Sequence, residues 1–347
     1  MLSRDRAANQ NRKEKSMKLF TKTAVAAMLS MSLAAAADAG ALRLGTAAPE
    51  GSPWGKFLAG FAAKTAELSG GELTITPFWS QELGDEQTMV RQAARGRVDI
   101  VAVSNTAISL LVPEYSLMSA PYIFDSPEQA DCVYDKHMRD AFGAELDAAG
   151  IVPLADFEVG QQIIFSKSLI KTPADLAGTK IRTAPTIPDS VFMEEAGGVA
   201  VPLGGVDTMP ALKTGSVTAV TWPTVFGIAV GYAQEAPFVT TTNHVYQVGL
   251  VAMSKKTAAG LSEQEMGWVI EAATAMNGLR GAIRGAEGAL IGKIKGAGLT
   301  VHDPDADELA AWKAVAPAAQ ARIVSEMGGN AAEVWDRVQA AKAACTN

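Results

Sequence analysis

Hydrophobic and polar positions along this chain show two kinds of pattern, one typical of strands and one typical of helices, and segments of the two kinds alternate. Short apolar runs are typical of strands, whereas apolar residues that recur every three or four positions are typical of helices. The pattern predicts strands over residues 41–47, 73–78, 98–103, 151–155, 162–166, 180–183, 199–201, 217–221 and 248–254. It predicts helices between them over residues 53–69, 85–95, 189–197, 206–214 and 223–234. This alternation favours an α/β fold with a mainly parallel sheet.

The alternation occurs in two blocks, which predicts two lobes. We expect the chain to cross between the lobes at residues 155–162 and 246–249, where one apolar run leads to the next without a long loop. Ser262 and Glu265 form a capping box, and the helix that they open is predicted to continue to Ala297. At 1.5 Å per residue such a helix is roughly 50 Å long, so it would lie across both lobes.

The predicted division of the chain follows from these elements. Residues 1–39 form an N-terminal extension and a signal peptide. Lobe 1 takes residues 40–158 and about 249–283, and lobe 2 takes residues 159–248 and about 284–300. Two shorter helices, over residues 306–316 and 331–344, belong to a C-terminal segment, residues 301–347.

Polar residues follow three of the predicted strands at their carboxyl ends. These are residues 48–51 with Glu50, residues 79–81 with Trp79, and residues 104–106 with Asn105. In open α/β sheets, ligands bind outside the carboxyl ends of the strands. Residues of these types also cap the helices that follow such strands, and that alternative stays open.

Arg182 ends a further strand, at residues 180–183. The preceding Thr172-Pro173-Ala174-Asp175 is typical of one capped helical turn. Pro185 and Pro188 are expected to hold the next residues extended and so keep this strand end open. A guanidinium at this place suits a carboxylate ligand. Solvation, or pairing with a local acid, is the alternative for an arginine at a strand end.

Composition narrows the class of protein. A chain of 347 residues with 48% apolar and 19% charged residues can bury one large core or two smaller ones. The net charge of −7 gives no basic surface for nucleic acid. Lys18 and Lys22 precede an apolar stretch and a small-residue site at Ala37-Asp38-Ala39, which predicts a cleaved signal peptide. We expect translation to start at Met17 and the mature protein to be periplasmic.

Residues with reactive side chains are few and isolated. His137, His244 and His302 have no neighbouring ligand at metal spacing, and no G-x-S-x-G motif is present. Cys132 and Cys345 are either a disulfide or two free thiols, since the sequence does not give their separation. The sequence therefore predicts no metal, no cofactor and no enzymatic activity. An exported two-lobe chain of this kind is interpreted as a binding protein.

Five stretches resemble one known family. They are GGELTITPFWSQELGDE at residues 70–86, RGRVDI at 95–100, VPEYSLMSAPYIF at 112–124, PADLAGTKIR at 173–182 and ALKTGSV at 211–217. The chain resembles the periplasmic solute-binding proteins of tripartite ATP-independent (TRAP) transporters over nearly all of its mature length. The resemblance implies two α/β lobes, joined by crossing strands and a long helix, that close over an organic acid. It also implies delivery of that acid to a membrane permease by a monomer.

The resemblance also implies roles for particular residues. Arg182 matches the arginine that holds the ligand carboxylate in this family. With Gln162 and Trp222 beside Arg182, the chain is similar to the branch of the family that binds small keto or hydroxy monocarboxylates. A ligand of this kind is therefore favoured over a dicarboxylate or a sugar acid. That branch holds a metal ion with acids at the positions of Thr221 and Gln247, and because neither acid is present no metal is expected.

The complete predicted site contains nine residues. They are Arg182, Gln162, Thr221, Trp222, Phe226, Gln247, Asn105, Trp79 and Glu50. For Trp222 and Phe226, a place in the core is the alternative. For the whole protein, a sensor subunit that signals to a receptor is the alternative to a transport subunit, and an exported enzyme is a third possibility.

Overall fold

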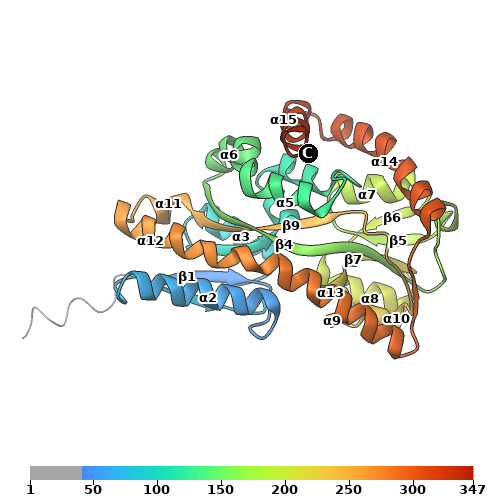
Figure 1. The fold of residues 1–347 in the computed structure, drawn as a ribbon, viewed down its shortest axis with the longest axis horizontal. Helices are drawn as coiled ribbons and strands as arrows, with labels where there is room; N and C mark the ends of the chain where they lie inside the picture. Colours follow the sequence, from blue (N-terminus) through green and yellow to red (C-terminus); the bar gives the residue numbers. More distant parts are fainter. Residues whose placement is uncertain (1–40, 347) are drawn as a thin grey trace, which may run out of the picture. The chain divides into compact units, whose positions relative to one another are not determined.

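The computed structural model describes residues 41–346, and these form a mixed α/β fold (Figure 1). The strands are β1 (Ala41–Thr46), β2 (Thr74–Phe78), β3 (Ile100–Ser104), β4 (Ile151–Ser166), β5 (Lys180–Thr183), β6 (Val199–Pro202), β7 (Ala219–Pro223), β8 (Phe238–Thr240), β9 (Tyr246–Ser254) and β10 (Thr300–His302). The fold class predicted from the sequence is confirmed. The predicted signal peptide and the start at Met17 lie outside the described residues.

Helices connect the strands and continue to the C-terminus. They are α2 (Pro53–Leu68), α3 (Glu86–Ala94), α4 (Asn105–Ile108), α5 (Pro127–Lys136), α6 (Met138–Ala148), α7 (Ile187–Glu195), α8 (Gly205–Thr214), α9 (Thr224–Ala229), α10 (Tyr232–Glu235), α11 (Lys255–Ala258), α12 (Glu263–Ala273), α13 (Leu279–Gly296), α14 (Ala306–Met327) and α15 (Ala331–Ala344). Short 3₁₀ helices are η1 (Pro113–Ser119), η2 (Pro173–Leu176) and η3 (Thr274–Gly278). Within the described residues, no helix combines the length and hydropathy needed to cross a membrane.

The strands follow the order β2-β1-β3-β9-β4-β7-β5-β6, and β8 pairs with both β4 and β10. We call β1 to β3 with their helices the first lobe, and β5 to β8 with theirs the second lobe. Pairing is parallel between β1 and β3 and between β5 and its neighbours β6 and β7. It is antiparallel wherever β4 or β9 takes part. The prediction of a mainly parallel sheet is therefore right inside the lobes and wrong at the strands that cross between them.

Strand β4 joins the two lobes. Residues 151–161 pair with β9, and residues 162–166 pair with β7 of the second lobe. The sequence predicted two short strands here because residues 156–161 include two acids and a glycine. They form instead the middle of one strand of 16 residues, with irregularities at Pro153/Ala155 and Glu158/Gly160. The predicted crossing at residues 155–162 is thus an extended segment that both halves of the sheet share.

The predicted long helix is interrupted. Helices α12 and α13 follow one another along the fold in Figure 1, and η3 separates them. Helix α12 packs on α2 of the first lobe, whereas α13 packs on α9 of the second lobe and on β4. At the break, a Cβ added at Gly278 would lie 3.0 Å from the Phe57 ring, so glycine favours close packing of this segment on α2. The helical run spans both lobes as predicted, but not as a single α-helix.

Several local predictions need correction. Helices α5 and α6 were not predicted, and helix α14 continues through Pro317 instead of ending at Ala316. The helix predicted over residues 223–234 is divided, because Gly231 has a φ of +86°. Pro188 does not extend the chain after Arg182. It lies in the first turn of α7, where the missing N–H has no helical partner to lose, and Thr186 caps that turn by accepting from the Asp189 N–H.

Ion pairs attach β4 to α13. The Arg284 guanidinium lies 2.7 Å from Asp131 of α5 and 2.7 Å from Glu158 of β4. The Glu158 side chain is only 1% exposed, so its charge needs this partner. One turn further along α13, the Glu287 Oε1 accepts a hydrogen bond of 2.7 Å from the Gln161 N–H. The crossing strand is therefore held through both charge and backbone contacts.

Stability should depend on pH through Glu287. Burial, helped by the nearby Glu158 carboxylate, raises the pKa of Glu287 to about 8 from 4.5. A raised carboxyl pKa means that the folded state binds more protons than the unfolded state between these two values, so stability falls as pH rises through that window. Glu287→Gln keeps the acceptor for Gln161 and cannot ionise. We expect its Tm relative to the wild type to increase from pH 5 to pH 8 and to level off above pH 8.

A thermal melt series from pH 5 to pH 9 checks this expectation. Glu333→Gln is the matched control, because Glu333 is exposed in the first turn of α15. Its Tm difference from the wild type should stay constant over the series. A constant difference for Glu287→Gln as well would show that the Glu287 carboxyl is not destabilising when ionised.

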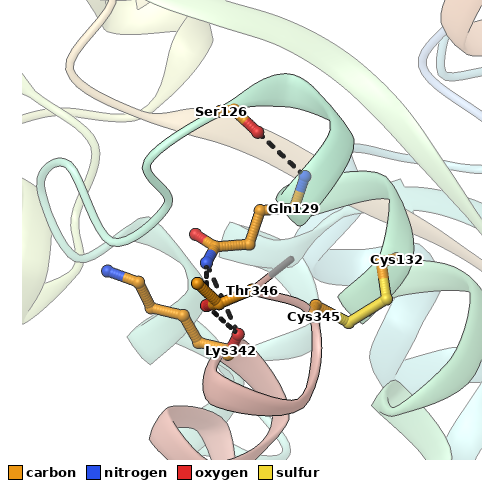
Figure 2. Close-up of a disulfide and its surroundings, with 6 residues drawn as sticks. All are labelled: Ser126, Gln129, Cys132, Lys342, Cys345 and Thr346. Atoms are coloured by element: carbon orange, nitrogen blue, oxygen red, sulfur yellow. Dashed lines mark hydrogen bonds between the residues drawn. A yellow bond between two sulfur atoms is a disulfide. The ribbon is translucent and has the colours of Figure 1, made fainter.

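A disulfide fastens the C-terminus of the chain. Cys132 of α5 and Cys345, directly after α15, are bonded with an S–S distance of 2.05 Å (Figure 2). Beside this bond, the Gln129 Nε2 donates to the Thr346 Oγ1 at 2.9 Å and to the Lys342 carbonyl at 3.4 Å. The alternative of two free thiols, which the sequence left open, is thereby excluded. The disulfide links residues that are 213 positions apart.

Candidate functional site

A cavity of about 930 Å³ lies between the two lobes. The first lobe contributes residues after β1, β2 and β3, and the second lobe contributes Arg182 and residues of α8 and α9. Phe157 and Gln162 of β4 and Gln247 of β9 line it as well. The carboxyl ends of parallel strands thus open into this cavity from both sides, as expected for a ligand site in an α/β fold.

Arg182 presents an incompletely paired guanidinium to the cavity. Its side chain is buried, with 4% of the residue exposed. Nε and Nη2 donate to the Leu203 carbonyl at 2.9 and 2.6 Å, and Nη1 donates to the Thr221 carbonyl at 3.2 Å. Arginine has five N–H groups, so these three bonds leave one on each of Nη1 and Nη2. Within residues 41–346, Arg182 forms no ion pair, so these two groups suit a carboxylate.

The charge of Arg182 is maintained despite burial. Burial lowers its pKa to about 10, while nearby Tyr232 and Asp189 act in the opposite direction. The guanidinium therefore stays protonated at neutral pH. Its Cζ lies 3.9 Å from the centre of the Trp222 ring, so a cation–π contact fixes its plane. These contacts orient the arginine before any ligand binds.

Gln162 and Thr221 lie beside Arg182 and are paired with each other. The Thr221 hydroxyl donates to the Gln162 Oε1 at 2.6 Å. The Gln162 Nε2 donates in turn to the Asp189 carboxylate at 3.1 Å, which also accepts from Thr186. Burial raises the pKa of Asp189. This chain of bonds leaves Gln162 with one free N–H, so its first role is to fix the wall of the cavity.

Aromatic rings form the apolar part of the wall. Phe226 of α9 stacks on Trp54 of α2, with ring centres 4.2 Å apart, and both rings line the cavity. Trp222 is half-buried and also lines it. The Trp54–Phe226 stack joins the two lobes at this point. Trp54 lies in the helix predicted over residues 53–69 but was not among the predicted site residues, because its spacing in α2 is that of a core position.

Six of the nine predicted site residues meet in this cavity: Arg182, Gln162, Thr221, Trp222, Phe226 and Gln247. The other three lie elsewhere. Asn105 is fully buried behind Gln247, whose Nε2 donates to its Oδ1 at 3.2 Å. Trp79 packs against the core of the first lobe, and Glu50 is exposed to solvent. Neither lines the cavity, although their neighbours Ser80 and Pro49 do.

Glu86 is one of several lining residues that the sequence analysis did not predict. Glu86, the first residue of α3, lines the cavity, and its two carboxylate oxygens accept from the Ser104 N–H at 3.0 Å and hydroxyl at 2.6 Å. Burial raises its pKa, although the bonds from Ser104 act in the opposite direction. The sequence treated the neighbouring Asp85 as a helix start, which it is, and offered no separate signal for Glu86.

Known proteins share this architecture. The family model of bacterial extracellular solute-binding proteins, family 7, matches residues 44–326. The chain belongs to this family. A solute-binding protein of Roseobacter denitrificans is 28% identical to it over 89% of this chain and 96% of that protein. The 2,3-diketo-L-gulonate-binding periplasmic protein of Escherichia coli is 27% identical over 68% of this chain and 72% of that protein.

The fold of this solute-binding protein is similar to that of a solved structure. The sugar acid-binding protein of Advenella mimigardefordensis, in complex with galactonate, has a TM-score of 0.80 and 25% identity, over 87% of this chain and 98% of that chain. The predicted TRAP-type solute-binding protein is thereby confirmed, as is its two-lobe fold. Because the relatives are solute-binding proteins, the transport interpretation is favoured over the sensor alternative.

Proposed function

We propose that this solute-binding protein captures a small organic acid in the cavity between its lobes and passes it to a TRAP permease. The observation that carries the proposal is Arg182, a buried cation that lines the cavity with two unpaired N–H groups. Two parallel N–H groups match the two oxygens of a carboxylate. A buried charge without a counterion is costly, and an anionic ligand supplies one.

Closure of the lobes strengthens the contacts between the protein and its ligand. When the lobes close, water leaves the cavity, and the attraction between Arg182 and a carboxylate strengthens as the local dielectric falls. Trp222 keeps the guanidinium plane fixed, and the bonded pair Gln162 and Thr221 keeps the neighbouring wall rigid. A ligand favours the closed state only to the extent that it binds that state more tightly than the open one.

The remaining predictions are part of the same proposal. The ligand roles of Arg182, Gln162, Thr221, Trp222, Phe226 and Gln247 belong to it, as do the residue boundaries of the two lobes. The protein acts as a monomer in the periplasm after removal of a signal peptide, and it releases its ligand chemically unchanged. Its function is therefore transport and not turnover.

A thermal-shift comparison tests the carboxylate requirement. Galactonate and the corresponding uncharged amide, galactonamide, differ only in the group that Arg182 is proposed to hold. A ligand that binds only the folded state raises the Tm by an amount that grows with its concentration relative to its Kd. We expect acids to raise the Tm and the amide to leave it unchanged at the same concentration. Equal shifts for the acid and the amide would overturn the proposal.

A further inference from the structure

A histidine lies beside the disulfide that fastens α15. The Sγ atoms of Cys132 and Cys345 and one ring nitrogen of His137 all lie within 4.8 Å of one another. No ligand was expected near His137, because Cys132 is five positions earlier and a regular helix would place the two side chains on different faces. His137, however, separates α5 from α6, and with a φ of −123° it departs from helical geometry. The end of α5 therefore brings its ring close to the two sulfur atoms.

The His137 ring has no partner within the protein. Among residues 41–346 it forms no side-chain hydrogen bond and no ion pair, whereas both other histidines do. The His244 Nδ1 lies 2.7 Å from the Thr242 hydroxyl, and the His302 Nε2 lies 2.6 Å from the Glu308 carboxylate. Both of these rings have structural roles. The His137 ring is also partly exposed, so it is available to a metal ion.

Reduction of the disulfide supplies two further ligands. A thiolate of an external dithiol attacks the partly exposed Cys132 sulfur, and Cys345 leaves as a thiolate. The second thiol of the reductant then releases Cys132 and closes a cyclic disulfide, so the two electrons come from the dithiol. The protein now carries two thiols. A metal ion that binds both sulfurs displaces their protons.

Two thiolates and one imidazole are ligands that zinc prefers. Zinc binds thiolate sulfur at about 2.3 Å and imidazole nitrogen at about 2.0 Å in a tetrahedral arrangement, which places the ligand atoms roughly 3.5 to 3.8 Å apart. The Cα atoms of Cys132 and Cys345 are 5.8 Å apart. Rotation of the two side chains is therefore enough to separate the sulfurs to this distance. Water completes the fourth position.

Other contacts keep the three ligands close together after reduction. The Gln129 Nε2 of α5 donates to the Thr346 Oγ1 at 2.9 Å, and the Lys342 ammonium lies 3.2 Å from the Asp125 carboxylate (Figure 2). Buried residues on one side of α15 belong to the core: Val334, Val338 and Ala341. The end of α15 is thus held on α5 without the disulfide, so the metal ligands need little reorganisation.

We propose that the reduced protein binds one zinc ion through Cys132, Cys345 and His137. The zinc ion then fastens α15 to α5 in place of the disulfide. The oxidised protein has no thiolates at this place and does not bind zinc there. None of the three residues lines the cavity between the lobes, so the inference is independent of the proposed transport function.

Titration with cobalt(II) chloride tests the proposal, because cobalt occupies zinc sites and absorbs light. The protein is reduced with dithiothreitol and freed of it without air. We expect a cobalt–thiolate charge-transfer band and the visible bands of tetrahedral cobalt, both saturating at one equivalent and both removed by zinc chloride. The oxidised wild type and the double variant Cys132→Ser and Cys345→Ser should show neither. Zinc should raise the Tm of the reduced wild type but not that of the double variant.

His137→Gln tests the third ligand. It should weaken cobalt binding by about tenfold or more, because losing even an outer partner of a metal ligand typically has an effect of this size. His302→Gln is the matched control and should leave the affinity unchanged. His137→Asn provides a second variant if a thermal melt shows that His137→Gln does not fold.

Three results would overturn the inference. They are the absence of a cobalt–thiolate band in the reduced wild type, saturation at half an equivalent, which would mean a metal shared between two molecules, and unchanged cobalt affinity in a folded His137 variant.

Discussion

Replacing Arg182 with alanine is expected to weaken ligand binding by about 2 to 5 kcal/mol, or roughly 30- to 5,000-fold. This range is typical when one member of a buried, hydrogen-bonded charge pair is removed and the other stays buried. Arg182 is 4% exposed, lines the cavity and has two unpaired N–H groups, so the substitution removes the proposed counterion of the ligand carboxylate. Calorimetric titration with galactonate measures the change in affinity.

Arg182→Lys separates charge from geometry. A lysine ammonium keeps the positive charge but cannot present two parallel N–H groups, so we expect an affinity between those of the wild type and Arg182→Ala. The substitutions also remove donors to the Leu203 and Thr221 carbonyls, and a thermal melt of each variant confirms that the fold is retained. Unchanged affinity in a folded Arg182→Ala would exclude Arg182 from the site.

Removing the disulfide is expected to produce the largest loss of stability. The double substitution Cys132→Ser and Cys345→Ser should lower the free energy of unfolding by about 2 to 5 kcal/mol. The bond closes a loop between residues 213 positions apart, and in the chain-entropy model a long loop gives a large restriction of the unfolded chain. Urea denaturation, followed by circular dichroism, measures the difference.

Reduction of the wild type provides the control for this variant. Wild-type protein in dithiothreitol should unfold at the denaturant concentration found for the double-serine variant, whereas the variant itself should not respond to the reductant. Reduction breaks the same bond without changing any side chain near Gln129, Lys342 and Thr346, whose hydrogen bonds lie beside the disulfide (Figure 2). A variant as stable as the oxidised wild type would mean that α15 is held by packing alone.

Much of the fold could be predicted because periodicity and capping are local signals. The capping boxes at Thr172–Asp175 and Ser262–Glu265 are both formed. The break at η3 was not predicted; Gly278, at its end, packs against the ring of Phe57, which is distant in sequence. Helix α5 was overlooked although Ala130, Val133 and Tyr134 have helical spacing and are buried. In that case the signal was present and unused.

The site was less accessible to sequence reasoning. Arg182 was found through a local motif and a family resemblance, and it lines the cavity as predicted. Glu86 and the unpaired Oε1 of Gln247 could not be found in this way. Whether such a group has a hydrogen-bond partner depends on residues far along the chain. Asn105 illustrates the reverse case: it is polar and at a strand end, but its hydrogen bonds are made within the protein.

The contact between Arg182 and a bound acid is the most direct test of the function proposed for this solute-binding protein. A crystal structure of the protein with galactonate gives the distances from Nη1 and Nη2 to the two carboxylate oxygens. We predict that both distances are about 2.7 to 2.9 Å, the range for charged N–H···O pairs. A carboxylate held elsewhere in the cavity, with Arg182 still bonded only to Leu203 and Thr221, would contradict the account.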